Sequence, residues 1–479
     1  MKKALIPILL LVIGIWLASC QKDPISSNPS FKLDFSIDTV VFDTVFTTIG
    51  SATRSLKVYN RNRSDINISS VRLMGGNSSA YRINVDGQPT DYARDILLRG
   101  KDSLFVFVEV TVDPTNEDAP MLVSDSIVFE TNGNIQDVKL ISWGQDMHLY
   151  KADTLFESTT FTADKPYLIY DYLWVKPDVE LTIEPGARIH SHNGAWILVE
   201  GKLVVNGEPE NPVIFEGDRL ELFYRDKPGQ WGGIWLTPSS HSNIINWAII
   251  SNAITGINIL PFANPDFKTL TITNSIVKNM SYMAIDARGA SIESGNCLFA
   301  NAKEMCLSLA AGTYNFSHCT IANYWGQYVT RTGPALLLAN YYLYQAASGD
   351  VEIAEYGLEA SFTNSIIYGS RSNEVELVNS YYGQPINSPF IYHFENSLIR
   401  FDNLSDSSNF INVIFDKPLF IDPYGQDFQL ESESPAINAG LMEFALKYPF
   451  DLNNVSRISD NNPDIGAYEW VEEEEEEEK

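Results

Sequence analysis

The sequence of 479 residues predicts an all-β protein, with an N-terminal immunoglobulin-like β-sandwich followed by a right-handed parallel β-helix. Two observations lead to this prediction. Apolar and polar residues alternate in short runs between about residues 31 and 146, and a short pattern then returns every 22 residues, as TNSIVKN (273–279), GNCLFAN (295–301) and SHCTIAN (317–323). Alternation with period 2 is typical of half-buried strands, whereas a fixed repeat of short apolar runs is typical of a solenoid.

Residues 1–20, MKKALIPILLLVIGIWLASC, are predicted to be a signal peptide, because two lysines precede an apolar run that is short for a bilayer span. The last four residues resemble the lipobox of bacterial lipoproteins, which implies cleavage before Cys20 and membrane attachment through its acylated thiol. An ordinary signal peptide is the alternative. The QKDP that follows resembles the export signals of Bacteroidetes surface lipoproteins. We therefore expect an outer-membrane lipoprotein with its body exposed at the cell surface; the sequence leaves a periplasm-facing body open.

Charge and cysteine content narrow the classes of partner. The chain has 33 basic and 61 acidic residues, a net charge of −28, which argues against nucleic acid and anionic membrane surfaces. Residues 471–479 are predicted to be a solvated acidic tail. Cys297, Cys306 and Cys319 have no C-x-x-C spacing, so neither a disulfide framework nor a zinc site is expected. Their redox state does not follow from the sequence.

The sandwich is placed at residues 31–147, after a polar tether at 21–30. The run LFVFVEVTV illustrates the alternation, and about seven such strands are expected. The alternation in LFVFVEVTV puts five apolar side chains on a single face: Leu104, Val106, Val108, Val110 and Val112. The order of phrases in this segment resembles the ASH and major-sperm-protein type of immunoglobulin-like domain. That resemblance implies a spacer or interaction module without catalysis.

The β-helix is placed at residues 148–470. Within 179–217, short apolar runs starting at Leu181, Ile197 and Val213 are sixteen residues apart, and runs this short must stack coil upon coil. Equal positions in successive coils then lie about 4.8 Å apart and form columns. We expect amides in such columns to bond along the stack. The predicted columns are Asn274, Asn296 and His318; Ser275, Cys297 and Cys319; and Asn279, Asn301 and Asn323.

Two segments resemble bacterial right-handed parallel β-helix proteins. Residues 179–217 and PGQWGGIWL (228–236) are similar to their opening coils. Residues 417–470, with SPAINAG and DIGAYEW, are similar to a terminal segment shared by many surface proteins of this type, and we expect this segment to cap the helix. Asn438 replaces the usual Asp of SPAIDAG, and Asn454 stands at the Gly of the usual D-x-x-G-x-x-R (451–457). The scaffold hosts lyases, hydrolases, adhesins and stalks, so it does not determine function.

Catalytic patterns are weak in this sequence. The motif series of β-helical galacturonases is absent, and the closest match to a pectate lyase site is Asp286, Arg288 and Glu293. Asp286 and Arg288 share a strand face and are more simply an ion pair, and Glu374 and Glu376 form a carboxylate pair of the kind that chance supplies. We therefore favour a non-catalytic protein. A polysaccharide lyase or glycoside hydrolase with an unrecognised carboxylate site is the alternative.

Metal binding is predicted only weakly, and no other cofactor is expected. His190 and His192 share a strand face, but two ligands are too few for a site. A candidate calcium site near the C-terminus has four oxygen-bearing side chains: Asp451, Asn453, Asp460 and Asp464.

Aromatic residues in insertions are the strongest signal for binding, because flat rings bury large areas on sugars or proteins at low entropic cost. Residues 324–350 are predicted to protrude as a loop. Trp231 and Trp235 are expected to pack in a coil. The candidate ligand-binding rings are Tyr324, Trp325, Tyr328, Tyr341, Tyr342, Tyr344, Tyr381 and Tyr382. We thus expect an envelope lipoprotein that binds a glycan or an envelope protein; a structural spacer is the remaining alternative.

Overall fold

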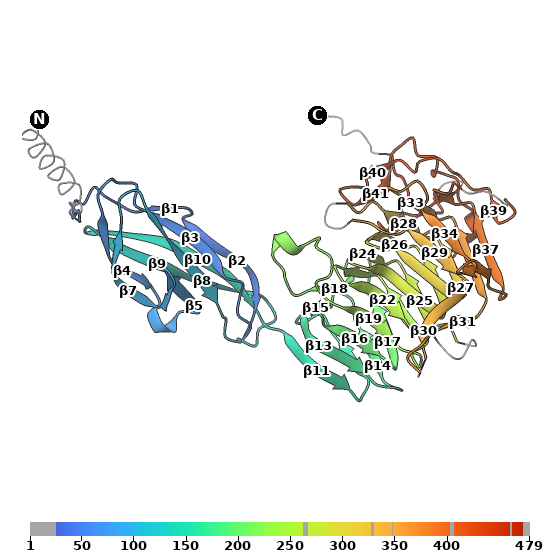
Figure 1. The fold of residues 1–479 in the computed structure, drawn as a ribbon, viewed down its shortest axis with the longest axis horizontal. Coiled ribbons are helices and arrows are strands. Elements are labelled where there is room, and N and C mark those ends of the chain that lie inside the picture. The colour runs from blue at the N-terminus through green and yellow to red at the C-terminus, as the bar shows by residue number, and fades with distance from the viewer. Residues whose placement is uncertain are drawn as a thin grey trace, which may run out of the picture. The chain divides into compact units, whose positions relative to one another are not determined.

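The computed structural model describes residues 25–261, 267–326, 330–346, 348–402, 407–459 and 462–472. Cys20 therefore lies outside the described residues. The chain divides into two compact units, Met1–Asp146 and Met147–Lys479, coloured blue to teal and teal to red in Figure 1. The predicted division fell after residue 147. Within the described part, no helix has the length and apolar character needed to span a membrane.

The first unit is a β-sandwich of two five-stranded sheets, with strand orders β1-β3-β8-β5-β6 and β2-β10-β9-β4-β7. β10 runs parallel to β2 and antiparallel to β9. The five residues of the predicted apolar face, 104 to 112, are all buried, which confirms the alternation. Ten strands form instead of about seven, because short strands such as β1 and β6 carry too few residues to alternate. The strands are β1 (Asp34–Phe35), β2 (Thr39–Phe46), β3 (Arg54–Tyr59), β4 (Ile66–Leu73), β5 (Tyr81–Val85), β6 (Gln88–Thr90), β7 (Tyr92–Leu98), β8 (Ser103–Val110), β9 (Met121–Thr131) and β10 (Asn134–Gln145).

The predicted tether at 21–30 is wrong in its second half. The Ser26 amide donates to the Asp65 carbonyl at 2.8 Å, and the Asn134 Nδ2 donates to the Pro29 carbonyl at 2.8 Å. Residues 26–30 thus belong to the sandwich, because their backbone groups find hydrogen-bond partners beside β4 and β10.

The second unit is a parallel β-helix: 25 strands form one continuous parallel sheet that winds through three faces (Figure 1). The first face consists of β13 (Tyr167–Val175), β16 (Trp196–Val199), β19 (Gly233–Leu236), β22 (Thr255–Ile259), β25 (Met283–Gly295), β27 (Leu307–Ser317), β29 (Leu336–Ala339) and β34 (Val375–Val378). The second consists of β12 (Thr159–Phe161), β14 (Glu180–Ile183), β17 (Lys202–Asn206), β20 (Asn243–Asn246), β23 (Leu270–Thr273), the second halves of β25 and β27, β32 (Leu358–Thr363), β37 (Phe390–Glu395) and β39 (Phe410–Ile411). The third consists of the start of β13, β15 (Arg188–Ser191), β18 (Val213–Gly217), β21 (Ala248–Ser251), β24 (Ile276–Met280), β26 (Leu298–Ala302), β28 (Thr320–Asn323), β33 (Ile366–Gly369) and β38 (Leu398–Ile399), and β11 (His148–Leu155) pairs with β13.

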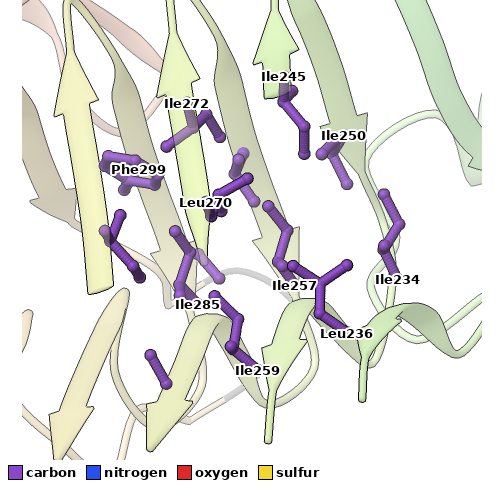
Figure 2. Close-up of a cluster of buried hydrophobic side chains, with 14 of the residues drawn as sticks. Ile234, Leu236, Ile245, Ile250, Ile257, Ile259, Leu270, Ile272, Ile285 and Phe299 are labelled. Carbon is purple, nitrogen blue, oxygen red and sulfur yellow. The ribbon is translucent and has the colours of Figure 1, made fainter. Parts of the chain in front are cut away.

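Two periods in the sequence have different structural meanings. Leu181 pairs with Leu203, one coil of 22 residues further on, whereas the sixteen-residue spacing merely separates different strands of the winding chain. Many inward positions are aliphatic, although the second face also carries a stack of phenylalanine rings that runs from Phe316 to Phe410. Figure 2 shows Ile234, Ile257 and Ile285 stacked in successive coils. All three are completely buried. Each such side chain contributes roughly 1.5 to 3 kcal/mol on burial, so the interior drives the coiling.

A column of left-handed residues joins the second face to the third. Asn274, Asn296 and His318 lie at equivalent positions in it, with φ of 52°, 55° and 51°. Among residues with a Cβ, Asn tolerates this conformation best. The Asn296 Nδ2 donates to the Asn274 Oδ1 at 2.8 Å, and the Asn364 Nδ2 lies 3.0 Å from the His318 Nε2. The column thus passes hydrogen bonds from coil to coil.

The column beside it holds small polar side chains that close the same turn. In Ser275, Cys297 and Cys319 the hydroxyl or thiol donates to the carbonyl two residues earlier, at 2.7, 3.3 and 3.4 Å. Ser365 and Ser397 continue the pattern. Cys297, Cys306 and Cys319 are free thiols buried in the helix, and burial raises the pKa of Cys306 to about 12.

The column Asn279, Asn301 and Asn323 does not pass amide hydrogen bonds along the stack, contrary to expectation. The Asn323 Nδ2 donates instead to the Ala302 carbonyl at 2.8 Å, and the Asn279 Nδ2 to the Asp226 Oδ1 at 3.4 Å. These side chains serve the loops between the third and first faces, because those loops differ in length from coil to coil.

Residues 417–470, here called the strap, lie alongside the third face and do not form the expected cap at its end. Its apolar residues Phe420, Phe428 and Ile465 form one buried cluster with Ala322 and Ile366 of that face. The strap contains β40 (Phe420–Asp422), β41 (Asp427–Leu430) and the short helix α2 (Met442–Ala445). It thereby ties successive coils together.

A buried guanidinium joins the strap to the asparagine column. Arg457 is fully buried, forms an ion pair with Glu469 through Nη1, and donates through Nη2 to the Asn296 Oδ1 at 2.8 Å. Asn438 and Asn454 both have positive φ, 55° and 62°. Asn readily replaces Gly in this conformation, which accounts for Asn454 at the expected Gly; Asn438 stands at an expected Asp, and both Asn and Asp tolerate such a φ.

We predict that Asn296→Ala lowers the free energy of unfolding of the β-helix by about 2 to 4 kcal/mol, because it leaves the buried Arg457 and Asn274 groups unpaired and places Ala in a left-handed turn. Denaturant unfolding measures the change. Asn412→Ala is the matched control, because Asn412 has the same φ but an exposed side chain bonded only to Asn396. Equal losses in the two variants would contradict a role for the buried column.

The strap offers a second comparison. Arg457→Met should destabilise the unit by about 3 to 5 kcal/mol, because it leaves the buried Glu469 carboxylate without its positively charged partner. Lys447→Met removes a second ion pair of the strap, between Lys447 and Glu293. The Lys447 side chain is half exposed, so this variant should lower the free energy of unfolding by only about 0 to 1 kcal/mol. Protease resistance of the strap would follow the same order, and a reversed order would show that the strap is held elsewhere.

Candidate binding site

The outer side of the first face carries a row of outward side chains, one from each of its last seven strands. Strand register aligns them across seven strands, and alternation turns them away from the aliphatic interior. We call them the first-face row: Leu198, Trp235, Asn258, Asp286, Ser308, Leu337 and Glu376. Successive members lie about 4.8 Å apart, so the row can follow an extended ligand along the helix axis.

One end of the row is aromatic. The Trp196 and Trp235 rings lie 5.4 Å apart, and Gly232 leaves room for them, because a Cβ there would come within 2.3 Å of the Trp196 ring. Among the described residues, the Trp235 Nε1 and Asn258 Oδ1 have no hydrogen-bond partner. A neighbouring indole donor and amide acceptor are thus buried without a hydrogen-bond partner in the described part of the chain. Trp231, in contrast, is fully buried and donates to the Ser251 carbonyl at 2.8 Å.

The middle of the row is charged. Asp286 and Arg288 form an ion pair of 2.7 Å, with side chains 11% and 33% exposed, so the simpler interpretation of these residues holds. Burial raises the pKa of the Tyr282 phenol, and the charges of Asp286 and Glu304 raise it further. The charges of two carboxylates therefore act on one phenol here. Glu293 lies apart on the second face, paired with Lys268 and Lys447.

Two hairpins follow strands of the first face and carry several tyrosine rings. One consists of β30 (Tyr341–Gln345) and β31 (Val351–Glu355), and the other of β35 (Ser380–Tyr381) and β36 (Gln384–Pro385). Asn340 and Ser388 join their bases by two hydrogen bonds of 2.8 Å. The hairpins are thus held together where they leave the coil.

Rings from the two hairpins meet. Tyr341 lies 5.9 Å from Tyr381 in an edge-on arrangement, and its hydroxyl donates to the Ser380 carbonyl at 3.1 Å. Tyr342 stacks on Tyr356 at 5.9 Å with an interplanar angle of 4°. A Cβ on Gly289 would lie 3.5 Å from the Tyr342 ring, which places this ring beside the first face.

Three rings remain substantially open to solvent: Tyr382 is 90% exposed, Tyr356 62% and Tyr344 41%. The Tyr344 hydroxyl donates to the Glu352 carboxylate at 2.6 Å, which leaves its ring faces available. We call the rings of the row and the hairpins the aromatic surface, consisting of Trp196, Trp235, Tyr341, Tyr342, Tyr344, Tyr356, Tyr381 and Tyr382.

Not every predicted ring belongs to it. Trp325 is buried, and Tyr324 packs on Phe420 and Phe428 of the strap, so neither lies in a protruding loop. The segment 324–350 also contributes β29 to the first face, so only part of it protrudes. Tyr328 lies outside the described residues.

The predicted calcium ligands bind backbone amides. Asp451 accepts from the amides of Asn453, Val455 and Glu469, and Asp464 accepts from that of Asn438. The positive charge near Asp451 and Asp464 is the Arg457 guanidinium. Asp460 lies outside the described residues, and within those described no group of three His, Cys, Asp or Glu side chains is arranged to hold a metal ion.

The histidines and the remaining acidic pair are also placed. Burial lowers the pKa of His190 to about 4, whereas His192 stacks on Tyr170 and lies 2.6 Å from the Asp218 carboxylate. Glu374 is buried in a 2.6 Å ion pair with Arg331, while Glu376 is exposed at the end of the row.

Trp196, Asn258 and Tyr356 escaped the sequence analysis. Asn258 is in register with Trp235, and Trp196 lies two positions before Leu198, the residue in register with Trp235 on the preceding strand, so aligning the coils would have revealed both. Tyr356 gave no signal, because its stacking on Tyr342 depends on the hairpin.

Comparison with known proteins supports the β-helix. Residues 153–263 match the family model described as a pectate-lyase-like beta helix domain. No curated protein matches the chain.

Three solved structures illustrate the structural likenesses, all remote. A family 123 glycoside hydrolase from Clostridium perfringens is 8% identical, with 23% of this chain and 25% of that chain covered, at a TM-score of 0.18. The ASH/PapD-like domain 7 of human CEP192 is 12% identical, with 26% of this chain and 90% of that chain covered, at a TM-score of 0.17. The catalytic unit of a GH87 α-1,3-glucanase from Streptomyces thermodiastaticus is 10% identical, with 75% of this chain and 87% of that chain covered, at a TM-score of 0.19. The fold assignment rests on the strand topology and on the match to the pectate-lyase-like beta helix model.

Proposed function

We propose that this chain is a cell-envelope lipoprotein, anchored through acylated Cys20, that binds a glycan on the aromatic surface without cleaving it. One observation carries the proposal. Solvent-exposed tyrosine rings on paired hairpins adjoin a row of strand positions on which an indole donor and an amide acceptor have no partner.

Physical chemistry favours a sugar as the occupant. Sugar rings present apolar faces that pack on aromatic rings, and hydroxyls at their edges that donate and accept hydrogen bonds. Binding sites typically combine such rings with a few well-placed polar groups. A buried donor or acceptor without a partner is destabilising by about 1 to 3 kcal/mol, so a ligand hydroxyl that reached the buried Trp235 Nε1 or Asn258 Oδ1 would relieve that cost.

The location in the cell forms part of the same proposal. Its support is the apolar segment ending in Leu-Ala-Ser-Cys, followed by polar residues before the sandwich. Several acyl chains on one cysteine hold a protein to a membrane, whereas a single chain is marginal. The sandwich would then separate the binding surface from the lipid.

The anchor makes a direct prediction. The full chain, expressed in a Gram-negative host fed radiolabelled palmitate, should incorporate label and fractionate with membranes. Cys20→Ala should abolish both, because acylation needs that thiol. Membrane retention of unlabelled Cys20→Ala protein would contradict a lipid anchor.

For the glycan, Tyr382→Ala and Trp235→Ala should each weaken retention on an insoluble polysaccharide about 2- to 12-fold, because a stacked ring contributes about 0.5 to 1.5 kcal/mol beyond its buried area. A panel of host, plant and bacterial polysaccharides identifies the ligand. Tyr92→Ala is the control, since Tyr92 is a 41% exposed ring on the sandwich. Unchanged retention in both site variants would contradict the proposal, and binding of an envelope protein alone would redirect it.

A second function, polysaccharide cleavage, is favoured by one observation: the charges of Asp286 and Glu304 both act on the Tyr282 phenol just before β25. The same incubations therefore record new reducing or unsaturated ends, with and without calcium. Our proposal expects none. New ends that disappear in Asp286→Asn and Glu304→Gln would establish an enzyme.

A further inference from the structure

A pocket of about 290 Å³ lies between the third face and the start of the strap. Its principal side chains are Tyr324, Tyr368, Arg400, Lys417 and Tyr424. Tyr368 comes from β33, Arg400 follows β38, and the last two belong to the strap. None of them belongs to the aromatic surface.

The pocket carries positive charge in a strongly acidic protein. The Arg400 guanidinium lies 5.1 Å from the centre of the Tyr368 ring, and its Nη1 donates to the Gly369 carbonyl at 2.7 Å. Among the described residues, neither Arg400 nor Lys417 has a carboxylate within ion-pair distance. By contrast Arg331, nearby, is neutralised by Glu374. A guanidinium has five donors, so most of those on Arg400 have no partner among the residues that the structure describes.

The remaining lining supplies hydroxyl donors and a ring. Burial raises the pKa of both Tyr324 and Tyr368, so both phenols keep their protons and can donate. Tyr424 is 68% exposed at the mouth, and its ring is held edge-on to Tyr324 at 5.6 Å. Donors therefore converge inside the pocket, and an aromatic face stands at its entrance.

We propose that this pocket binds one uronic acid residue, with its carboxylate held by Arg400 and Lys417 and its sugar ring against Tyr424. A planar carboxylate matches the fork of a guanidinium, and the phenols of Tyr324 and Tyr368 can donate to its oxygens. The volume lies at the lower end of the roughly 300 to 1,000 Å³ of ligand pockets, which suits one sugar unit rather than an oligosaccharide. The proposal goes beyond the aromatic surface and does not depend on it.

Calorimetric titration of the full mature chain with sodium glucuronate, sodium galacturonate, glucose and inorganic phosphate tests this assignment. We expect a uronate to bind, glucose to bind at least tenfold more weakly, and phosphate not to displace the uronate at equal concentration. Lys417→Gln and Tyr424→Ala should each reduce uronate affinity roughly 3- to 30-fold, because a charge-assisted contact or a ring is lost. Both side chains are exposed, so these variants should fold.

Arg400→Lys retains the charge but loses the fork, and should reduce affinity about tenfold or more. Arg371→Gln is the control, an exposed cation outside this pocket. Trp235→Ala and Tyr382→Ala should leave uronate binding unchanged, which separates this proposal from the glycan surface. Equal affinity for glucose and uronate, displacement by phosphate, or unchanged affinity in Lys417→Gln and Arg400→Lys would each overturn it.

Discussion

The in-register stacking of coils is the constraint on which the rest of this structure depends. Each coil must place its turns over those of the coil before, at a spacing set by backbone hydrogen bonds. A turn that needs a left-handed residue must then find one in every coil, and its buried polar groups must be satisfied along the stack. Asn296 meets both needs, bonding to Asn274 in one coil and to Arg457 of the strap. Outward positions are free of this demand, which is why the first-face row varies from Trp to Asn to Asp.

The strap packs across successive coils of the third face and links them into one unit. Its buried ion pair, Arg457 with Glu469, sits among amide and carboxylate groups that are bonded to backbone. A buried charge network stabilises a fold to the extent that its members are satisfied. Here the Arg457 Nη1 and Nη2 bond to the strap and to a coil, whereas its Nε has no partner among the described residues. By covering the third face, the strap also creates the wall of the pocket that holds Arg400 and Lys417. The aromatic surface forms at a different place, where the corner after the first face admits hairpins.

Local repetition explains what the sequence could predict. The 22-residue period, the columns through Asn274 and Ser275, and the alternation in β8 are visible because neighbouring residues obey the same rule in each copy. The path of the strap could not be predicted in this way, since Arg457 and Asn296 are 161 residues apart. For the same reason Tyr324 was expected to be exposed although the strap covers it, and Asp451 and Asp464 were expected to suit calcium although backbone amides satisfy them. Trp235 was expected to be buried because its outward direction follows only from the register with Asn258.

The account makes the aromatic surface the place where a glycan meets the β-helix. The most direct test is amide hydrogen exchange of the mature chain with and without a retained polysaccharide. We expect protection confined to the two hairpins β30–β31 and β35–β36 and to the strands β19 and β22 beneath Trp235 and Asn258. Protection confined to the sandwich, or to coils that carry none of these rings, would contradict the account.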